Sequence, residues 1–293
     1  MCYTTSNLLV RRGVLKMAAF DFELVGKIGS MALIRKDDND IDYNIFSRLC
    51  AQLRPGFIWV SSGATEIGRL DYMKRNGGKE IQSDTDDYKN DYAAQGQSIL
   101  MENYRRFISP QYSVRQILVE HQHFNNPAKR EYMHRMLTRA AAQNAIPIIN
   151  YNDAVSDQEN LNYELKNLRL LNEHVVECVD NDETAAVVAC LVKARTLLIL
   201  TTGLGIYHDP DNPSTLIREI TGATTEEVLQ NIEYTKTFCK GASRAGANGA
   251  KAKLSYISAP VQQGTQVIIG SAEYRISDLL NGTAPRTWIG VRR

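Results

Sequence analysis

Short apolar runs alternate with longer amphipathic segments along most of the chain. Phe57–Val60, Ile146–Asn150 and Thr196–Thr201 are almost continuously apolar, as is typical of strands that are buried on both faces of a parallel sheet. Ile41–Leu53 and Ala93–Ile108 instead repeat apolar residues at helical spacing. This β-α-β alternation predicts an α/β fold around a mainly parallel sheet.

The same patterns predict further elements. In chain order these are two strand-like pieces within 23–34, a helix after Ala64, strand Ser113–Val119, helix Ala128–Gln143, strand His174–Val179, helix Asp182–Lys193, helices Thr225–Cys239 and Ala247–Gln262, strand Gln266–Ile269, and a short helix Glu273–Leu280.

Two polar segments interrupt this order. Lys74–Asn90 is aperiodic and rich in Gly, Asp and Lys, which predicts an exposed loop that serves as a lid or an oligomer contact. Ala154–Glu173 is predicted as a long hairpin or loop over the site. Its stripe of Leu161, Leu165, Leu168 and Leu171 favours a helical packing face over a partner-binding zipper.

Charge and length narrow the class of protein. The 293 residues carry 34 Lys and Arg against 33 Asp and Glu, so a general nucleic-acid surface is not predicted and any anion site must be local. The basic end, Arg286, Arg292 and Arg293, is interpreted as a solvated tail.

No run approaches the roughly 20 apolar residues that span a bilayer, so no membrane segment is expected. We interpret 1–20 as an N-terminal extension rather than a signal peptide, and 21–293 as a single two-lobed domain.

Cysteine usage indicates a reducing compartment. The five cysteines form no CxxC pair and are odd in number, which predicts free thiols and a cytoplasmic location. Cys50, Cys178 and Cys190 lie in apolar patterns and are predicted to be buried.

Polar and small residues gather where the apolar runs end. Lys27-Ile28-Gly29, Ser61-Ser62-Gly63, Asn150-Tyr151-Asn152-Asp153 and Asp180-Asn181-Asp182 each lie at the end of a predicted strand or the start of a helix. Carboxyl ends of strands in an open α/β sheet are where ligands bind. Phosphoryl transfer needs cations near the transferring oxygens and donors that align the reactants, and this set of residues fits that need.

Two lysines are candidates for this cationic role. Lys27 ends the first strand, where Gly29 and Ser30 would let backbone amides approach a phosphate. Lys253 closes the small-residue segment 246–253, which runs into a helix whose amino end favours an anion. Asp153 and Asp182 each follow an Asn and could orient a lysine, bind magnesium water or hold a substrate ammonium, although Asp182 could equally be a helix N-cap.

Other nucleotide and metal signatures are missing. There is no GxxxxGK[ST], and Gly203-Leu204-Gly205 lacks the third glycine of a dinucleotide fingerprint. His121 and His123 have no evident third ligand, so no metal site is assigned and a solvated strand end is predicted for them.

Taken together, these segments resemble the amino acid kinase superfamily, and within it the glutamate 5-kinase branch, from about Leu24 to Thr283. Lys27-Ile28-Gly29-Ser30 resembles the family's phosphate loop and Ser61-Ser62-Gly63-Ala64 its substrate loop. The other matching segments are the helix motif Ala93-Ala94-Gln95-Gly96-Gln97, the acceptor strand 147–153, the acidic motif Asp180-Asn181-Asp182, and the nucleotide segments 201–207 and 246–253.

The resemblance implies a three-layer αβα sandwich, with an acceptor lobe (21–195) and a nucleotide lobe (196–293). It implies that Lys27, Asp182 and Lys253 are catalytic and that Ser62, Gly63, Asp153 and Asn181 bind the acceptor. The nucleotide residues it implies are Lys27, Gly29, Thr201, Thr202, Gly246, Asn248, Gly249, Lys251 and Lys253. The implied reaction uses ATP and Mg²⁺ to convert L-glutamate to γ-glutamyl phosphate, the first step of proline biosynthesis, in a homo-oligomer.

The chain departs from the family pattern at several positions. Tyr151 stands where the family usually has Glu, Thr202 where it has Asp, and Gly249-Ala250-Lys251-Ala252-Lys253 where it has Gly-Met-Ser-Thr-Lys. The chain also resembles a short form without the RNA-modification-type C-terminal domain. A kinase of another small acceptor, or a catalytically weak regulatory homologue, therefore remain as alternatives.

Overall fold

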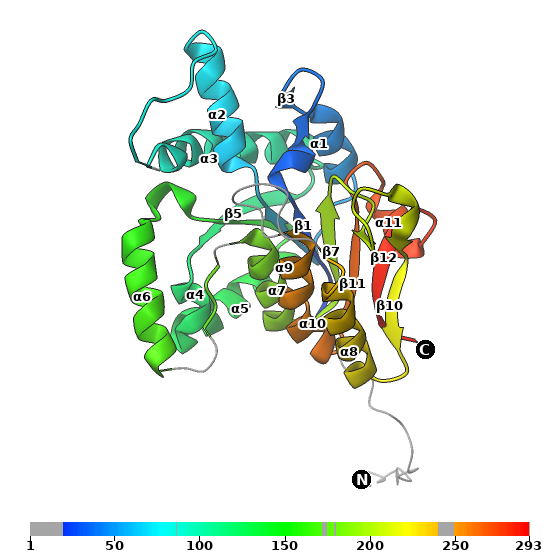
Figure 1. Ribbon diagram of the computed structural model, residues 1–293. Coiled ribbons are helices and arrows are strands. Elements are labelled where there is room, and N and C mark those ends of the chain that lie inside the picture. Colours follow the sequence, from blue (N-terminus) through cyan, green and yellow to red (C-terminus); the bar gives the residue numbers. More distant parts are fainter. Residues whose placement is uncertain (1–19, 86, 172–174, 179, 240–248, 293) are drawn as a thin grey trace, which may run out of the picture.

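An eight-stranded sheet forms the centre of the molecule (Figure 1). The computed structural model describes residues 20–85, 87–171, 175–178, 180–239 and 249–292. The sheet order is β10-β12-β11-β7-β1-β4-β6-β5. Its strands are β1 (Phe22–Ile28), β4 (Phe57–Ser61), β5 (Ser113–Val119), β6 (Ala145–Tyr151), β7 (Ala194–Thr201), β10 (Glu219–Gly222), β11 (Gln266–Ser271) and β12 (Arg286–Val291).

Most neighbouring strands are parallel. β1 pairs with β4 on one side and with β7 on the other, and both pairings are parallel. Within the described strands of this eight-stranded sheet, only the β11–β12 pairing is antiparallel, so β12 and its parallel neighbour β10 run against the other six strands. β1 is the first strand and lies in the middle of the sheet, so later strands are added on both sides of it. Because β1, β4, β6 and β7 are parallel, their carboxyl ends all lie along the same side of the sheet, which we call its carboxyl edge.

Helices cover both faces of the sheet. The helices are α1 (Tyr43–Cys50), α2 (Ala64–Arg75), α3 (Tyr88–Phe107), α4 (Gln122–Asn125), α5 (Pro127–Ala142), α6 (Gln158–Leu171), α7 (Asn181–Leu191), α8 (Thr225–Lys236), α9 (Gly249–Tyr256), α10 (Ser258–Gln262) and α11 (Ile276–Asn281). Alternate residues of each strand face opposite cores, as the two-residue period of a strand requires. Val25 belongs to the core that also contains residues of α4, α5 and α7 to α10, whereas Leu24 belongs to the core that contains residues of α1, α2, α3 and α11. The predicted αβα sandwich is therefore confirmed, and Figure 1 shows α7 to α10 in front of the strands.

Short elements complete the connections. The 3-10 helices are η1 (Ser30–Leu33), η2 (Asp153–Val155) and η3 (Pro213–Thr215). The small antiparallel pairs are β2 (Ile34–Arg35) with β3 (Asp40–Ile41), and β8 (Ile206–Tyr207) with β9 (Leu216–Ile217).

Two glycines allow α2 and α3 to cross at very short range. A Cβ atom on Gly68 would lie 1.8 Å from the Tyr92 carbonyl oxygen, and one on Gly96 would lie 1.9 Å from the Ala64 carbonyl oxygen. No residue with a side chain fits at either position without moving a helix backbone. Since α2 begins directly after Ser62 and Gly63, this crossing fixes where that loop lies.

Several predicted elements differ in the structure. The predicted hairpin or loop at Ala154–Glu173 is wrong, because most of it forms α6, at the left edge in Figure 1. Leu161 and Leu165 form its buried face, as predicted, but Leu171 is 82% exposed. The helix predicted at 247–262 is two helices, α9 and α10, in the part that is described.

The strand predicted at His174–Val179 is also wrong for its described residues, 175–178, which pair with no strand. β6 already has β4 and β5 as its neighbours, and these four residues do not pair with the edge strand β5. Val176 is held instead by the Asn125 side chain, whose Nδ2 donates to the Val176 carbonyl (2.7 Å) and whose Oδ1 accepts from its amide (3.0 Å).

The basic end is not a solvated tail throughout. Arg286 begins β12, is half-buried, and donates from Nη1 to the carbonyls of Leu279 and Leu280. Arg292 is exposed and pairs with Glu219, and Arg293 lies outside the described residues.

Among the described cysteines all four are free thiols, and Cys50 and Cys178 are buried as predicted, whereas Cys190 is half-buried.

Candidate functional site

The predicted catalytic residues Lys27, Asp182 and Lys253 meet in one cluster. Lys27 Nζ lies 2.7 Å from Asp182 Oδ1, and Lys253 Nζ donates to Asp182 Oδ2. Asp182 is 1% exposed and Lys27 is 5% exposed. Burying an ionised carboxylate is costly unless cations compensate it, so the two lysines and the aspartate stabilise one another.

Three separate elements bring this cluster together. Lys27 lies in β1, Asp182 in the first turn of α7, and Lys253 in α9. The N-cap of α7 is Asp180, whose Oδ1 accepts from the Asp182 amide (2.8 Å). Asp182 is therefore not the cap residue that its sequence also allowed, and its carboxylate is free to hold the lysines.

The charge state of the cluster follows from its geometry. Burial alone would raise the pKa of the Asp182 carboxyl, but Lys27 and Lys253 outweigh it and hold that pKa below its usual value. Each ammonium has three donors and contacts one oxygen of Asp182. Hydrogen-bond donors therefore remain on both lysines. Two lysine cations share one carboxylate, so the cluster keeps a net positive charge, which suits the binding of a phosphoryl group.

The predicted substrate loop, Ser61-Ser62-Gly63, leaves β4 beside this cluster. Gly63 has φ +116°, in the left-handed region that favours glycine. A buried relay supports the loop from behind: Trp59 Nε1 donates to Tyr104 Oη (3.1 Å), Tyr104 Oη to Ser61 Oγ (2.8 Å), and Ser61 Oγ to the Ser62 carbonyl (3.0 Å).

A chain of side-chain amides leads to two of the predicted acceptor residues, Ser62 and Asn181. Asn181 Nδ2 donates to Ser62 Oγ (3.1 Å) and to Asn150 Oδ1 (2.9 Å), and Asn150 Nδ2 donates to Gln97 Oε1 (2.9 Å). Within the described residues, Asn181 Oδ1 is buried without a hydrogen-bond partner. Such an orphaned acceptor is costly unless a ligand supplies a donor.

Asp153 adds a second acceptor at the same edge. It begins η2, directly after the end of β6, and burial raises the pKa of its carboxyl to about 6. Tyr151, which stands where the related pattern has Glu, is 9% exposed and packs in the core on the α7 face, with its hydroxyl 3.5 Å from Ser156 Oγ. Tyr151 therefore adds no charge to the carboxyl edge of the sheet, whereas the Glu of the related pattern would.

The structure describes only some of the predicted nucleotide-binding residues. Gly29 donates its amide to the Leu200 carbonyl (3.2 Å) and lies beside the Lys27 ammonium. Thr201 ends β7, and Thr201 and Thr202 line a cavity of about 250 Å³ with Ser271 of β11. Gly249 and Lys251 lie in α9, with Lys251 exposed. Gly246 and Asn248 lie outside the described residues, and the role of all these positions stays a prediction.

The donor set fits a nucleotide phosphate better than a protein-bound metal. Both oxygens of Asp182 are engaged by lysines. Across the described ranges, no group of three or more His, Cys, Asp or Glu side chains is arranged to hold an ion. A magnesium ion would fit this site as part of the nucleotide complex, held mainly by phosphate oxygens.

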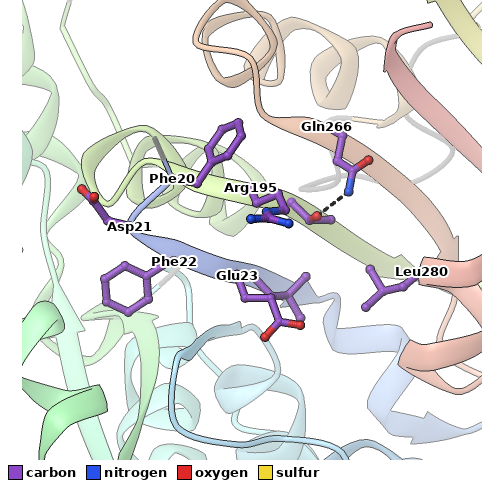
Figure 2. Close-up of a pocket in the computed structure, with 9 residues that line it drawn as sticks. Phe20, Asp21, Phe22, Glu23, Arg195, Gln266 and Leu280 are labelled. Carbon is purple, nitrogen blue, oxygen red and sulfur yellow. Dashed lines mark hydrogen bonds between the residues drawn. The ribbon is translucent and has the colours of Figure 1, made fainter. Parts of the chain in front are cut away.

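A different cavity, of about 450 Å³, opens at the opposite edge of the sheet (Figure 2). It is lined by the amino ends of β1 and β7, including Phe22 and Arg195. Its Gln266 side chain donates to Thr196 Oγ1 (2.7 Å) and accepts from Trp288 Nε1 (3.2 Å). This cavity lies a strand's length from the lysine cluster and contributes nothing to it.

The prediction that His121 and His123 lie at a solvated strand end is wrong. His121 is 5% exposed, not solvated, and its Nε2 lies 2.7 Å from Glu164 Oε2 on α6. His123 Nδ1 accepts from the Glu120 amide (3.0 Å). Because α6 was predicted as a loop, no sequence pattern pointed to a partner for His121.

Two parts of the site were missed by sequence reasoning. Gln97 and Asn150 were noted within matching segments but were given no role, and the Trp59–Tyr104–Ser61 relay was not anticipated. A buried Asn at the carboxyl end of an apolar strand is the one signal that could have drawn attention to Asn150.

Fold and site together define an αβα protein with a lysine pair suited to phosphoryl groups. Residues 23–271 match the model of the amino acid kinase family, and the chain belongs to that family. It is 28% identical over 279 residues to the glutamate 5-kinase of Halalkalibacterium halodurans, covering 91% of this chain and 67% of that protein. It is 30% identical over 236 residues to the glutamate 5-kinase of Clostridium perfringens, covering 77% of each.

The chain spans only part of some relatives, 57% of the glutamate 5-kinase of Shouchella clausii, for example. Among solved structures, it is similar to a carbamate kinase from Giardia lamblia bound to AMP-PNP. The TM-score is 0.57 at 15% identity, over 94% of this chain and all of that one. At that identity the likeness supports the fold alone. No helix in the described part of the chain is long and apolar enough to cross a membrane.

Proposed function

We propose that this chain is an ATP-dependent kinase that phosphorylates the side-chain carboxylate of L-glutamate, giving γ-glutamyl phosphate and ADP. The observation that carries the proposal is the Lys27–Asp182–Lys253 cluster at the carboxyl ends of the strands, next to Asn181, whose Oδ1 is buried and has no hydrogen-bond partner among the described residues. Similarity to glutamate 5-kinases supports the choice of acceptor.

The acceptor side favours a ligand that carries an ammonium group. Asn181 Oδ1 is buried and unpartnered among the described residues, and Asp153 is a carboxylate whose ionised form is disfavoured by burial. A cationic amine would satisfy both, because it donates hydrogen bonds and carries a positive charge. An amino acid meets this requirement, whereas a carboxylic acid without an amino group does not.

The phosphoryl side requires little proton chemistry. A γ-carboxylate is already ionised at neutral pH, so one of its oxygens can attack the γ-phosphorus without a general base. The bond from that phosphorus to the ADP oxygen breaks as the new bond forms. Lys27 and Lys253 would neutralise charge on the transferring group, and Asp182 would hold both ammonium groups in position.

The cellular setting belongs to the same proposal. We infer a role in the first step of proline biosynthesis, a cytoplasmic location and a homo-oligomeric state, with Mg²⁺ carried by the nucleotide. These follow from resemblance to glutamate 5-kinases and from cysteines that form no disulfide among the described residues.

An acceptor panel tests the proposal. ADP release is measured with ATP and Mg²⁺ and with L-glutamate, L-aspartate or UMP, and hydroxylamine is added to trap an acyl phosphate. We expect ADP release and hydroxamate with L-glutamate, and little with the other two acceptors. ADP release with UMP alone would identify another acceptor class, and ATP binding without turnover of any acceptor would favour a regulatory protein that keeps the fold.

A further inference from the structure

Within the described part of the chain, Gln97 of α3 makes no hydrogen bond to a predicted catalytic or binding residue, yet it ends the amide chain that leads to them. Its Oε1 accepts from Asn150 Nδ2, and Asn150 contacts Asn181. Asn150 is 2% exposed, so it has little access to water and its hydrogen bonds depend on these neighbours.

The direction of this amide chain is fixed by a backbone group. The Tyr151 amide donates to Asn150 Oδ1 (2.9 Å), and a backbone N–H can only donate. The Asn150 atom at that position must therefore be its oxygen, and its Nδ2 must point to Gln97. Gln97 in turn presents its oxygen, because two amide nitrogens would repel each other.

The same logic continues to Asn181. Since Asn150 presents Oδ1, the facing atom of Asn181 must be Nδ2, which also donates to Ser62 Oγ. Asn181 Oδ1 is thereby turned away from this chain, and it is the buried acceptor that has no partner among the described residues. The orientation of the Asn181 amide thus follows from that of Asn150, which the Tyr151 amide holds at its oxygen and Gln97 holds at its nitrogen.

α3 is well placed to hold this arrangement. Gly96, next to Gln97, lies against the Ala64 carbonyl after the substrate loop, and Asn90 Nδ2 donates to the Ser156 carbonyl just after η2 (2.7 Å). One helix therefore contacts the Ser62 loop, the end of β6 and the Asp153 turn. A 20-residue helix with buried contacts is a rigid support for such a site.

We propose that Gln97 is a positioning residue that sets acceptor selectivity: by holding the Asn150 amide, it keeps Asn181 Oδ1 directed to a substrate ammonium. This inference rests on the proposed function. It assigns to Gln97 the preference for amino acids over dicarboxylates of the same length, and no part in phosphoryl transfer itself.

Gln97→Met tests this, because methionine keeps the length of glutamine and removes the accepting oxygen. We expect the KM for L-glutamate to rise about tenfold, which is the effect of losing one buried hydrogen bond. The KM for ATP, and the Ki of glutarate as a competitor of L-glutamate, should stay within about twofold, because glutarate has no ammonium for Asn181 to bind.

Three further variants complete the test. Gln97→Glu retains an accepting oxygen and should restore the KM for L-glutamate to within about threefold of wild type. Gln95→Met is a matched control on the same helix, since the half-buried Gln95 side chain donates to Asp71 of α2 (2.6 Å) and not to the amide chain, and it should leave all three constants unchanged. Gln97→Ala should behave as Gln97→Met does, and it serves if the methionine variant does not fold.

The outcomes separate the two proposals. An unchanged KM for L-glutamate in Gln97→Met, or an equal rise in the KM values and the glutarate Ki, would overturn the positioning role while leaving the kinase assignment intact. If the wild-type chain turned over no L-glutamate, the proposed function would fail, and this inference would fail with it.

Discussion

Single residues at the acceptor edge determine what the site can bind. Asp153 and Asn181 both offer oxygen acceptors, and they do so in an environment where an unmatched charge or dipole is costly. Binding of an ammonium group would relieve both costs at once.

The raised pKa of Asp153 gives a pH dependence with a definite sign. Burial raises the pKa of this carboxyl from its ordinary value to about 6, and an ammonium ligand prefers the ionised form. The KM for L-glutamate should therefore be lowest above pH 6 and rise about tenfold per unit below it. Both carboxylates of L-glutamate stay largely ionised down to about pH 5, so the protein is the group that titrates in this window.

Asp153→Asn is the control for this prediction, with the KM for L-glutamate measured between about pH 5 and pH 8. The variant should bind weakly and without this pH dependence. It should also unfold less readily at neutral pH, because a raised carboxyl pKa means that the fold loses stability as pH rises towards about 6. A wild-type KM that is flat across this range would contradict the role of Asp153.

At the residue scale, the sequence predicted which three charged side chains would meet, but it did not predict their surroundings. Lys27, Asp182 and Lys253 were predicted together, and the structure brings them together. Gln97 was missed because nothing in a helix pattern tells which glutamine on its surface will meet a buried asparagine from a strand far along the chain.

Elements carry these residues to their places, and the α2–α3 crossing matters most. Gly96 lets α3 approach the Ala64 carbonyl, one residue after the substrate loop. Any side chain there would force the two helices apart and move Ser62 and Gly63 with them.

Gly96→Ala should therefore affect both stability and acceptor binding. We expect the free energy of unfolding to fall by about 2 kcal/mol, measured by denaturant titration, with a higher KM for L-glutamate. Ala94→Ser, an exposed change on the same helix, should alter stability by no more than about 0.5 kcal/mol. If Gly96→Ala were as stable as wild type, the crossing would not be the constraint that we describe.

Element prediction succeeded where apolar periodicity was strong and failed where pairing decided the outcome. The buried strands β4, β6 and β7 were predicted close to their observed bounds. β10 and β12 were not predicted, because Glu219–Gly222 and Arg286–Val291 are short and contain polar residues and glycine. Their extended form depends on pairing with each other and with β11. α6 was missed because its polar, Asn-rich sequence concealed a narrow stripe of buried leucines.

On the scale of the whole molecule, the central position of β1 explains how one site could serve the two reactants of the proposed reaction. The proposed acceptor residues lie on the β4 and β6 side of β1, and Lys253 comes from α9 beyond β7. Asp182 on α7 joins the two sides by holding Lys27 and Lys253. The central claim is that this cluster performs phosphoryl transfer to an amino acid carboxylate.

The most direct test compares trapped acyl phosphate from wild type and Lys253→Met at saturating ATP and L-glutamate, with hydroxylamine present. Lys253 is the more exposed of the two lysines, and Lys27 still pairs with Asp182 in this variant, so the fold should persist in circular dichroism. We predict hydroxamate from wild type and at least about 100-fold less from Lys253→Met, with Lys166→Met, an exposed lysine change on α6, equal to wild type. A Lys253→Met protein that forms hydroxamate at the wild-type rate would contradict the account.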